Sequence, residues 1–309
     1  MNPVIMPPMM DDQATDLRKL VSSIRSVDAA ARISGVKSVA ILSGKGGVGK
    51  SSLAVNLSLA MAELGLRVTI LDADLGLANL DILFGVTPKF HMGHVMRGDK
   101  ELADIIYRVG DMISIIPGGA GLRDLADIDD QKQAWIINRL SNLEAETDIL
   151  ILDTSAGIHK NVLSFAMASD LSLLITTPEP TAIRDSYSVL KSLFQMAGSA
   201  LNAGMVVNMV KNEREGISVG ERIIATAGHF LNVKIPYFGC VIWDAAMMDA
   251  VRRRRPLLMS EENSVSAPCF RELARKILEF KETPERSDGI TAGNSFIGRL
   301  ARQIAKKES

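Results

Sequence analysis

The phosphate-binding pattern GxxxxGK[ST] is matched at each fixed position by one run, Gly44-Lys45-Gly46-Gly47-Val48-Gly49-Lys50-Ser51. Glycines let the backbone approach phosphates closely, because a Cβ would block the contact. The N–H groups and the start of a following helix would then face the negative charge. Lys50 would reach the β- and γ-phosphates, and the Ser51 hydroxyl would hold Mg²⁺. With Ser52, these residues predict a site for a nucleoside triphosphate and its metal ion.

The surroundings of this run favour a binding loop over a glycine-rich turn that only happens to carry a lysine. An apolar stretch at 39–42 precedes it, and a helical pattern at 53–57 follows. A strand, a loop and a helix in that order are the structural context that the motif requires.

Acidic residues end two other apolar runs. Asp72 and Asp74 leave the second candidate strand, and Asp153 closes the run 149–152. Ligands of parallel sheets bind beyond the carboxyl ends of the strands, so these carboxylates are expected beside the loop. Phosphoryl transfer relies on positioning and charge stabilisation, which requires a group that holds water in line. An ordinary Asp-rich turn at a strand end remains the alternative for each of them.

Short apolar runs alternate with helical patterns along most of the chain. Strands are expected at 38–42, 67–72, 112–116, 148–153, 171–176, 204–209 and 236–241, and helices at 51–64, 131–143, 181–197, 221–230, 246–255 and 265–282. The continuous apolar character of several strands suits a sheet covered on both faces. The pattern predicts an α/β, three-layer P-loop fold with a mostly parallel sheet flanked by helices, plus helical extensions at both ends.

Composition and segment chemistry divide the 309 residues. Residues 1–36 read as an N-terminal extension, 37–282 as the nucleotide-binding domain, 283–294 as a polar linker and 295–309 as an amphipathic helix. A hydrophobic content of 47% suffices for one extended core, and the net charge of −1 creates no field toward nucleic acid. Two distant cysteines, with no secretory or membrane-spanning pattern, predict a cytoplasmic protein.

The early lysine, Lys45, gives the loop the form KGGxGK[ST], which resembles the deviant Walker A motif of MinD/ParA-type ATPases. The resemblance implies that Lys45 reaches the ATP of a second subunit, so that ATP drives formation of a homodimer. A solvated lysine that the loop tolerates is the alternative.

The segment from Asp72 to Asp81 resembles the MinD pattern DxDxGxxNLD, and the strand ending at Asp153 resembles a Walker B strand. By that resemblance Asp72 supports hydrated Mg²⁺, Asp153 serves the metal with Ser51, and Asp74 orients the attacking water. Lys45, Lys50 and Asp74 would then be catalytic. Asn208, at the end of a later strand, would contact the adenine edge, although Asn is also common in turns.

Several branches of this family lack support in the sequence. A relative that binds an iron–sulfur cluster requires paired cysteine ligands, and the sequence contains no CxxC. A tyrosine autokinase carries a tyrosine-rich tail, whereas no tyrosine follows Tyr237. DNA-binding partition ATPases use basic surface, which the four arginines at 252–255 could supply, but the solvated end of a helix before Pro256 is the favoured interpretation.

The segment 12–18, with Asp12, Gln13, Ala14, Leu17 and Arg18, resembles the DQAxxLR motif of the FlhG (FleN/YlxH) family. The resemblance implies a helix that binds the signal-recognition-type GTPase FlhF and speeds GTP hydrolysis. It also implies control of flagellar number and placement, with flagellar switch (C-ring) proteins or a transcription activator as further partners. The alternative is a short amphipathic cap on the core domain.

The tail places four apolar residues on one helical face, namely Phe296, Ile297, Leu300 and Ile304. Flanking basic residues complete a resemblance to the membrane-targeting helix of MinD and FlhG. One copy would bind anionic lipid weakly, whereas the two copies of a dimer would bind well through avidity. This predicts peripheral association with the inner membrane face on dimerisation. A helix packed against the body is the alternative.

A division-site ATPase of the MinD kind, or a nucleotide-gated protein that sequesters a transcription activator, remains an open alternative to the flagellar function as a whole.

Overall fold

One mostly parallel sheet organises the chain. The computed structural model describes residues 37–74, 79–119, 146–197, 201–280 and 296–305. Within that part the strand order is β3-β4-β2-β5-β1-β6-β7-β8. All neighbouring pairs are parallel except β3 and β4, which are antiparallel. The predicted α/β P-loop fold is therefore confirmed.

The strands lie close to their predicted positions. Their bounds are β1 Ser38–Leu42, β2 Val68–Ala73, β3 Tyr107–Val109, β4 Ile113–Ile116, β5 Ile149–Thr154, β6 Leu171–Thr176, β7 Ala203–Val210 and β8 Tyr237–Ile242. The central strands β1, β2, β5 and β6 are buried along their whole length, as expected for strands covered on both faces.

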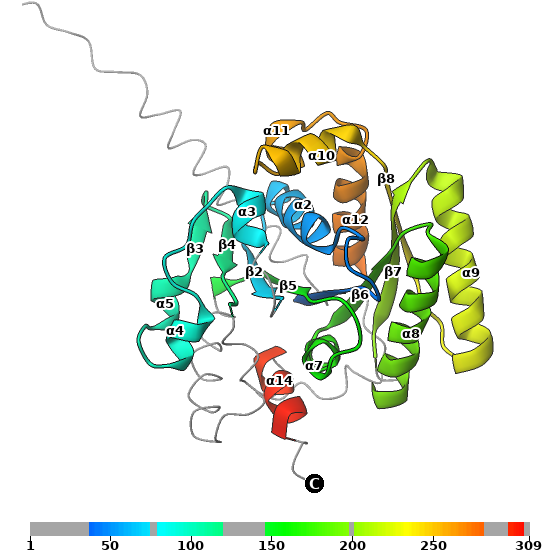
Figure 1. Cartoon of the computed structure of the whole chain (residues 1–309), viewed down its shortest axis with the longest axis horizontal. Coiled ribbons are helices and arrows are strands. Elements are labelled where there is room, and N and C mark those ends of the chain that lie inside the picture. The colour runs from blue at the N-terminus through cyan, green and yellow to red at the C-terminus, as the bar shows by residue number, and fades with distance from the viewer. Residues whose placement is uncertain (1–36, 75–78, 120–145, 198–200, 281–295, 306–309) are drawn as a thin grey trace, which may run out of the picture.

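Helices cover the sheet on both faces (Figure 1). Their bounds are α2 Lys50–Glu63, α3 Leu80–Phe84, α4 Met92–Met96, α5 Leu102–Ile105, α7 Lys160–Ala168, α8 Pro180–Ala197, α9 Glu213–Leu231, α10 Ala245–Arg252, α11 Leu257–Ser260, α12 Ala267–Glu279 and α14 Phe296–Ala305. Helices α2 and α12 pack together on one face, whereas α7, α8 and α9 lie on the other.

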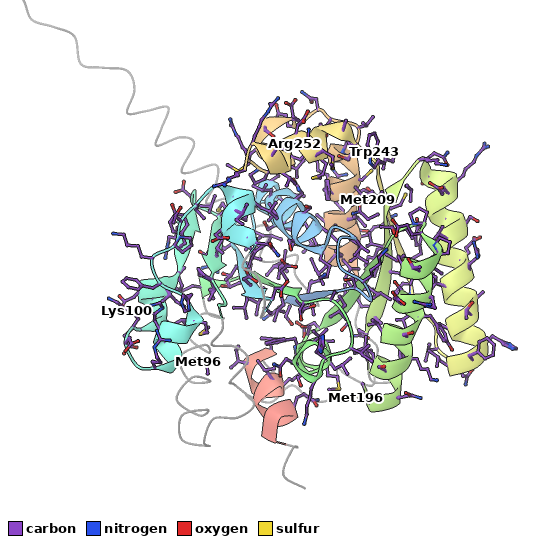
Figure 2. All side chains as sticks on the ribbon, in the orientation of Figure 1. Met96, Lys100, Met196, Met209, Trp243 and Arg252 are labelled. Carbon is purple, nitrogen blue, oxygen red and sulfur yellow. The ribbon has the colours of Figure 1, made fainter. Side chains whose placement is uncertain are left out.

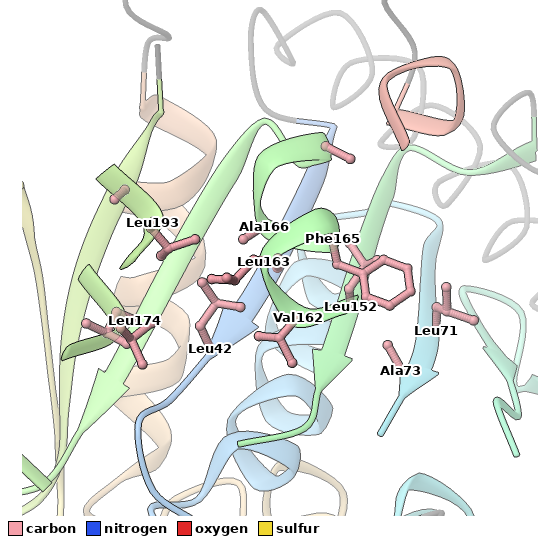
Figure 3. Packing of buried hydrophobic residues seen from close by; sticks show 14 of the residues in the cluster. Leu42, Leu71, Ala73, Leu152, Val162, Leu163, Phe165, Ala166, Leu174 and Leu193 are labelled. Atoms are coloured by element: carbon pink, nitrogen blue, oxygen red, sulfur yellow. The ribbon is translucent and has the colours of Figure 1, made fainter. Parts of the chain in front are cut away.

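Two apolar layers result, one on each face of the sheet. Figure 3 shows part of the layer beneath α7, where Val162, Leu163 and Phe165 meet Leu42 of β1 and Leu152 of β5. The alternate residues of the same strands, including Ile41 and Ile151, enter the opposite layer with α2 and α12. Period-two alternation of a parallel strand thus supplies both layers at once.

Several elements differ from the sequence expectation. Helix α7 and the short pieces β3, α3, α4, α5 and α11 had not been predicted, because each is too short for a clear period. The helix predicted at 221–230 is longer and begins at Glu213, where the Asn212 side chain accepts a hydrogen bond from the Glu215 N–H. The helix predicted at 246–255 ends at Arg252, since Arg254 adopts φ +52° ahead of Pro256. The helix implied for segment 12–18, the helix expected at 131–143 and the linker at 283–294 lie outside the described residues.

Helix α14 packs on the body beside α7 (Figure 1). Phe296, Ile297 and Leu300 are buried in the layer beneath the sheet. Three of the four residues expected to face a membrane therefore contact protein, and the packed alternative describes this conformation. The side chain of Ile304 lies outside the described part. No helix in the described ranges is both long and apolar enough to cross a membrane.

Candidate active site

The loop between β1 and α2 adopts the shape that its glycines permit. Gly47 and Gly49 have φ of +79° and +92°, in the left-handed region. Helix α2 begins directly afterwards at Lys50, so its first N–H groups open toward the loop. A Cβ on Gly49 would lie 2.3 Å from Asn208 Nδ2. This position therefore requires glycine for both its conformation and its space.

Neighbouring strands hold the loop at the carboxyl edge of the sheet. The Asn208 Nδ2 group donates a hydrogen bond to the Val48 carbonyl oxygen at 2.8 Å. On the other side, the Gly157 N–H donates to the Ser43 carbonyl oxygen, also at 2.8 Å. Gly44 packs so closely on α8 that a Cβ would lie 2.2 Å from the Asp185 carbonyl carbon. The loop is thus a fixed cradle, tied to β5, β7 and α8.

Asp72 and Asp153 are register partners on the adjacent strands β2 and β5. Burial raises the pKa of Asp72 to about 8, and the neighbouring Asp153 charge adds to that rise. Burial also raises the pKa of Asp153 to about 6, although the Ser51 hydroxyl and Lys50 oppose the change. The pKa of both carboxyl groups stays raised although Lys50 lies beside Asp153, so burial outweighs the one nearby positive charge.

The pair fits a divalent cation. Both carboxylate oxygens of Asp153 are buried, and no hydrogen bond of good geometry reaches either one from the described residues. An unsatisfied buried carboxylate is costly unless a ligand compensates it. Mg²⁺ binds oxygen ligands and keeps several waters, so one hydroxyl and one or two carboxylates make a suitable set. Ser51, Asp72 and Asp153 would supply such a set, because Asp72 and Asp153 are register partners and the Ser51 hydroxyl lies beside Asp153.

Lys50 and Asp74 complete this group of charges. Lys50 is only 9% exposed, and burial lowers its pKa while the charges of Asp153 and Asp74 oppose the shift. The Asp74 N–H donates to Asp72 Oδ1 at 3.1 Å, which fixes the backbone where β2 ends. Asp74 itself is partly exposed at the mouth of the site. Asp74 is thus a partly exposed carboxylate close to the buried Lys50 and to the Asp72–Asp153 pair, and its predicted role in holding a water stays a prediction.

Lys45 lies apart from this group. Its Nζ contacts Glu179 Oε2 at 2.6 Å and Thr181 Oγ1 at 3.3 Å, both at the start of α8 in the same chain. Its side chain remains 42% exposed. Lys50 alone therefore lies within the cradle, and Lys45 sits on the surface of the loop.

Other predicted residues are placed less decisively. Ser52 lines a shallow pocket with Asn56, Met247 and Arg255. Asn208 supports the loop, as described above, and its predicted adenine contact stays a prediction. Asp244, to which no role had been assigned, caps α10 through the Ala246 N–H. Residues 12–18 and the segment 75–78 lie outside the described part.

The arginines at 252–255 are all exposed, and Figure 2 shows Arg252 near Trp243 at the top of the molecule. Arg252 contacts Asp249 at 3.4 Å, and Arg253 contacts Glu261 at 3.6 Å. These weak surface pairs are typical of a solvated helix end.

Sequence reasoning missed two polar groups that the fold assembles. Glu179 and Thr181, the partners of Lys45, lie more than 130 residues away in sequence. The run Thr-Pro-Glu-Pro after a buried strand was the available signal, because such a turn lies at the carboxyl edge of the sheet. Asp170 and Arg299, which join β6 to α14, had no such signal.

Comparison with known proteins agrees with this geometry. The family model for the CobQ/CobB/MinD/ParA nucleotide binding domain matches residues 39–257. The antiactivator FleN of Pseudomonas aeruginosa is 35% identical over 242 residues, which cover 78% of this chain and 86% of FleN. The flagellum site-determining protein YlxH of Helicobacter pylori is 29% identical over 296 residues, covering 96% of this chain and all of YlxH.

Among solved structures, the septum site-determining protein MinD from Pyrococcus horikoshii, complexed with Mg-ADP, has a similar fold. The TM-score is 0.62 at 24% identity, over 78% of this chain and 95% of that one. A P-loop with this geometry, beside a buried carboxylate pair suited to a divalent cation, takes ATP and Mg²⁺. The chain belongs to the CobQ/CobB/MinD/ParA nucleotide-binding family and is an ATPase of the MinD/ParA type, related to the flagellar proteins FleN and YlxH.

Proposed function

We propose that the protein is a nucleotide-controlled regulator of flagellar number and placement, which dimerises on ATP and hydrolyses it slowly. One observation carries the dimer: Lys45 stands on the loop surface, outside the cradle that Lys50 occupies. An exposed cation at the mouth of a phosphate site is available to a second nucleotide facing it. Lys45 and Lys50 stabilise phosphate charge, Asp74 orients water, and Ser51, Asp72 and Asp153 serve Mg²⁺.

The flagellar role rests on the relatives and on the N-terminal segment. FleN is named an antiactivator and YlxH a flagellum site-determining protein. Residues 12–18, which carry the DQAxxLR-like motif, bind an FlhF-like GTPase in this proposal, with Gln13 orienting a water. The test is the GTPase rate of the FlhF-like protein of the same organism, with a peptide of residues 11–27 or its Gln13→Ala variant. Stimulation that the variant loses supports the role, whereas no stimulation by the peptide of residues 11–27 counts against it.

Membrane association uses α14 in a released form. In the described conformation its apolar face packs on α7, which begins directly after residues 155–159 at the carboxyl edge of β5. A nucleotide-dependent conformational change at that edge could therefore reach α14 through the single helix α7. Two released helices in an ATP dimer then bind anionic lipid together, and hydrolysis reverses the binding at the cytoplasmic membrane face.

Liposome sedimentation tests this step. We expect sedimentation with ATP but not ADP, and loss of it in Ile297→Asp or Leu300→Asp. Because both residues are also buried against the body, thermal unfolding must show that each variant still folds. Phe230→Asp, an apolar-to-acidic change at an exposed position on α9, is the matched control. Unchanged sedimentation of the folded α14 variants excludes the membrane role.

A second candidate function is sequestration of a transcription activator, with hydrolysis as a timer. The specific observation that favours it is the relationship to FleN, an antiactivator. The two functions share one active site and differ in the partner. A pull-down from the native organism with the Asp74→Ala protein and ATP separates them: an activator retained only with ATP supports sequestration. Control of division-site placement instead predicts recovery of a septum inhibitor.

A further inference from the structure

The start of α8 holds the exposed P-loop lysine in its own subunit. Lys45 Nζ lies 2.6 Å from Glu179 Oε2 and 3.3 Å from Thr181 Oγ1. Glu179 follows β6, and Thr181 is in the first turn of α8. The Lys45 ammonium therefore has a carboxylate and a hydroxyl as partners within one chain.

The backbone on both sides of Lys45 is also fixed. Gly44 packs against the Asp185 backbone of α8 with no room for a Cβ, and the Ser43 hydroxyl donates to the Lys45 carbonyl oxygen at 2.8 Å. The loop cannot move away from α8 without breaking these contacts. Any change in the reach of Lys45 must therefore come from its flexible side chain, which must first leave Glu179.

We propose that Glu179 is a positioning residue that retains Lys45 in its own subunit and so raises the protein concentration at which ATP drives dimerisation. This inference rests on the proposed ATP-dependent dimer. The phosphates of a facing ATP compete with Glu179 for the ammonium. ADP offers one phosphate group fewer, so it competes less well, and the contact helps to distinguish the two nucleotides.

The size of the effect follows from the exposure of the pair. The side chains of Lys45 and Glu179 are 42% and 63% exposed, so solvent and salt screen their attraction. An exposed pair of this kind changes an equilibrium by a factor of about 1.4 to 5. Each dimer must release two such contacts, which gives about a 2- to 30-fold change in the dimer dissociation constant. The contact therefore sets a threshold and does not block assembly.

The test is the dimer dissociation constant of the full chain with Mg·ATP, by sedimentation velocity, in an Asp74→Ala background that limits turnover. We expect Glu179→Gln to lower that constant about 2- to 30-fold. Thr181→Val should shift it less, in the same direction. Binding of Mg·ADP to the monomer and the melting temperature should stay unchanged, because neither involves transfer of Lys45.

Asp185→Asn provides a matched control, because it removes one negative charge from the same helix without touching the Lys45 ammonium. It should leave the dimer constant unchanged. An equal shift in Asp185→Asn would overturn the proposal in favour of a general charge effect. So would an unchanged or weaker dimer in Glu179→Gln, provided that Asp74→Ala alone dimerises. If Asp74→Ala binds ATP yet never dimerises, the proposed function fails and the inference fails with it.

Discussion

Arg299 of α14 and Asp170 at the start of β6 form an ion pair, although 129 residues separate them. Arg299 Nε also donates to the Ala168 carbonyl oxygen at 2.6 Å, at the end of α7. Asp170 accepts further hydrogen bonds from the backbone N–H groups of Lys37 and Ser38. One arginine therefore joins the tail helix to both α7 and the amino edge of the sheet.

Replacing Arg299 should release α14. Arg299→Ala removes the ion pair and the bond to Ala168, while Asp170 keeps its backbone donors. Losing one partner of a largely buried pair costs about 3–5 kcal/mol, which should shift the balance from docked toward released α14 although its apolar face still packs on α7. We expect liposome sedimentation with ADP to rise above the wild-type ADP level but to stay below the level with ATP, because an ADP-bound monomer presents only one released helix. Arg299→Lys keeps the positive charge but cannot contact Asp170 and the Ala168 carbonyl oxygen at once, so its sedimentation with ADP should lie between those of wild type and Arg299→Ala. Equal sedimentation of wild type, Arg299→Ala and Arg299→Lys with ADP would contradict this prediction.

Asp74→Ala should trap an ATP-bound dimer. Removing the carboxylate that holds the attacking water should slow hydrolysis about 100-fold or more, while the phosphate cradle and the metal ligands remain. Steady-state phosphate release and size-exclusion chromatography with ATP measure the two effects. Asp99→Ala, which removes a carboxylate from a surface pair with Arg97, should behave as wild type. Wild-type turnover in Asp74→Ala would remove Asp74 from the mechanism.

Asp153→Asn should stabilise the nucleotide-free protein and abolish Mg²⁺-dependent hydrolysis. The pKa values of Asp72 and Asp153 are raised to about 8 and about 6. Because the folded state binds more protons than the unfolded state above about pH 4, the stability of the metal-free protein should fall between about pH 4 and 8.

The amide variant should flatten the lower part of that fall and raise the melting temperature by about 2–4 °C per kcal/mol recovered. Added Mg·ATP should stabilise wild type and leave the variant's melting temperature nearly unchanged. Thermal scans across this pH range, with and without EDTA, check both statements. A lower melting temperature in Asp153→Asn at pH 7.5 would contradict the argument that burial of the charged Asp153 carboxylate destabilises the metal-free protein.

Asn208→Ala separates support of the loop from recognition of the base. The Asn208 side chain donates a hydrogen bond to the Val48 carbonyl oxygen. Its loss should therefore weaken the binding of every nucleotide by about 0.5–1.5 kcal/mol. If Asn208 also contacts adenine, ATP should lose more affinity than a purine nucleotide without the exocyclic amino group. Calorimetric titration of ATP and of the matching purine triphosphate into wild type and Asn208→Ala measures the two losses of affinity. Equal losses would limit Asn208 to the loop.

The sequence predicted the elements whose pattern is local and missed the contacts that join distant segments. The P-loop and the strands ending at Asp72 and Asp153 could be located because buried parallel strands are continuous apolar runs. Their register, which makes Asp72 and Asp153 neighbours, depends on strand order and emerged only from the fold. Helix α7 was missed because its nine residues are too few to show a clear helical period.

The tail helix shows why amphipathicity alone does not identify a membrane anchor. The face with Phe296, Ile297 and Leu300 has the same pattern whether it meets lipid or protein. The docked state depends on Arg299 finding Asp170 and Ala168, which are far away in sequence. No local pattern contains that information.

Strand β6 carries a carboxylate close to each of its ends. Asp170 precedes its first residue and pairs with Arg299, and Glu179 follows three residues after its last one and pairs with Lys45. The strand between them spans about 20 Å and is buried throughout. A substitution that shifts this strand by one residue would misplace both carboxylates together. Random mutagenesis of its six positions should therefore yield variants in which the proposed nucleotide dependence of lipid binding and that of dimerisation are lost together. Substitutions in the outer strand β8 should affect these two proposed properties separately.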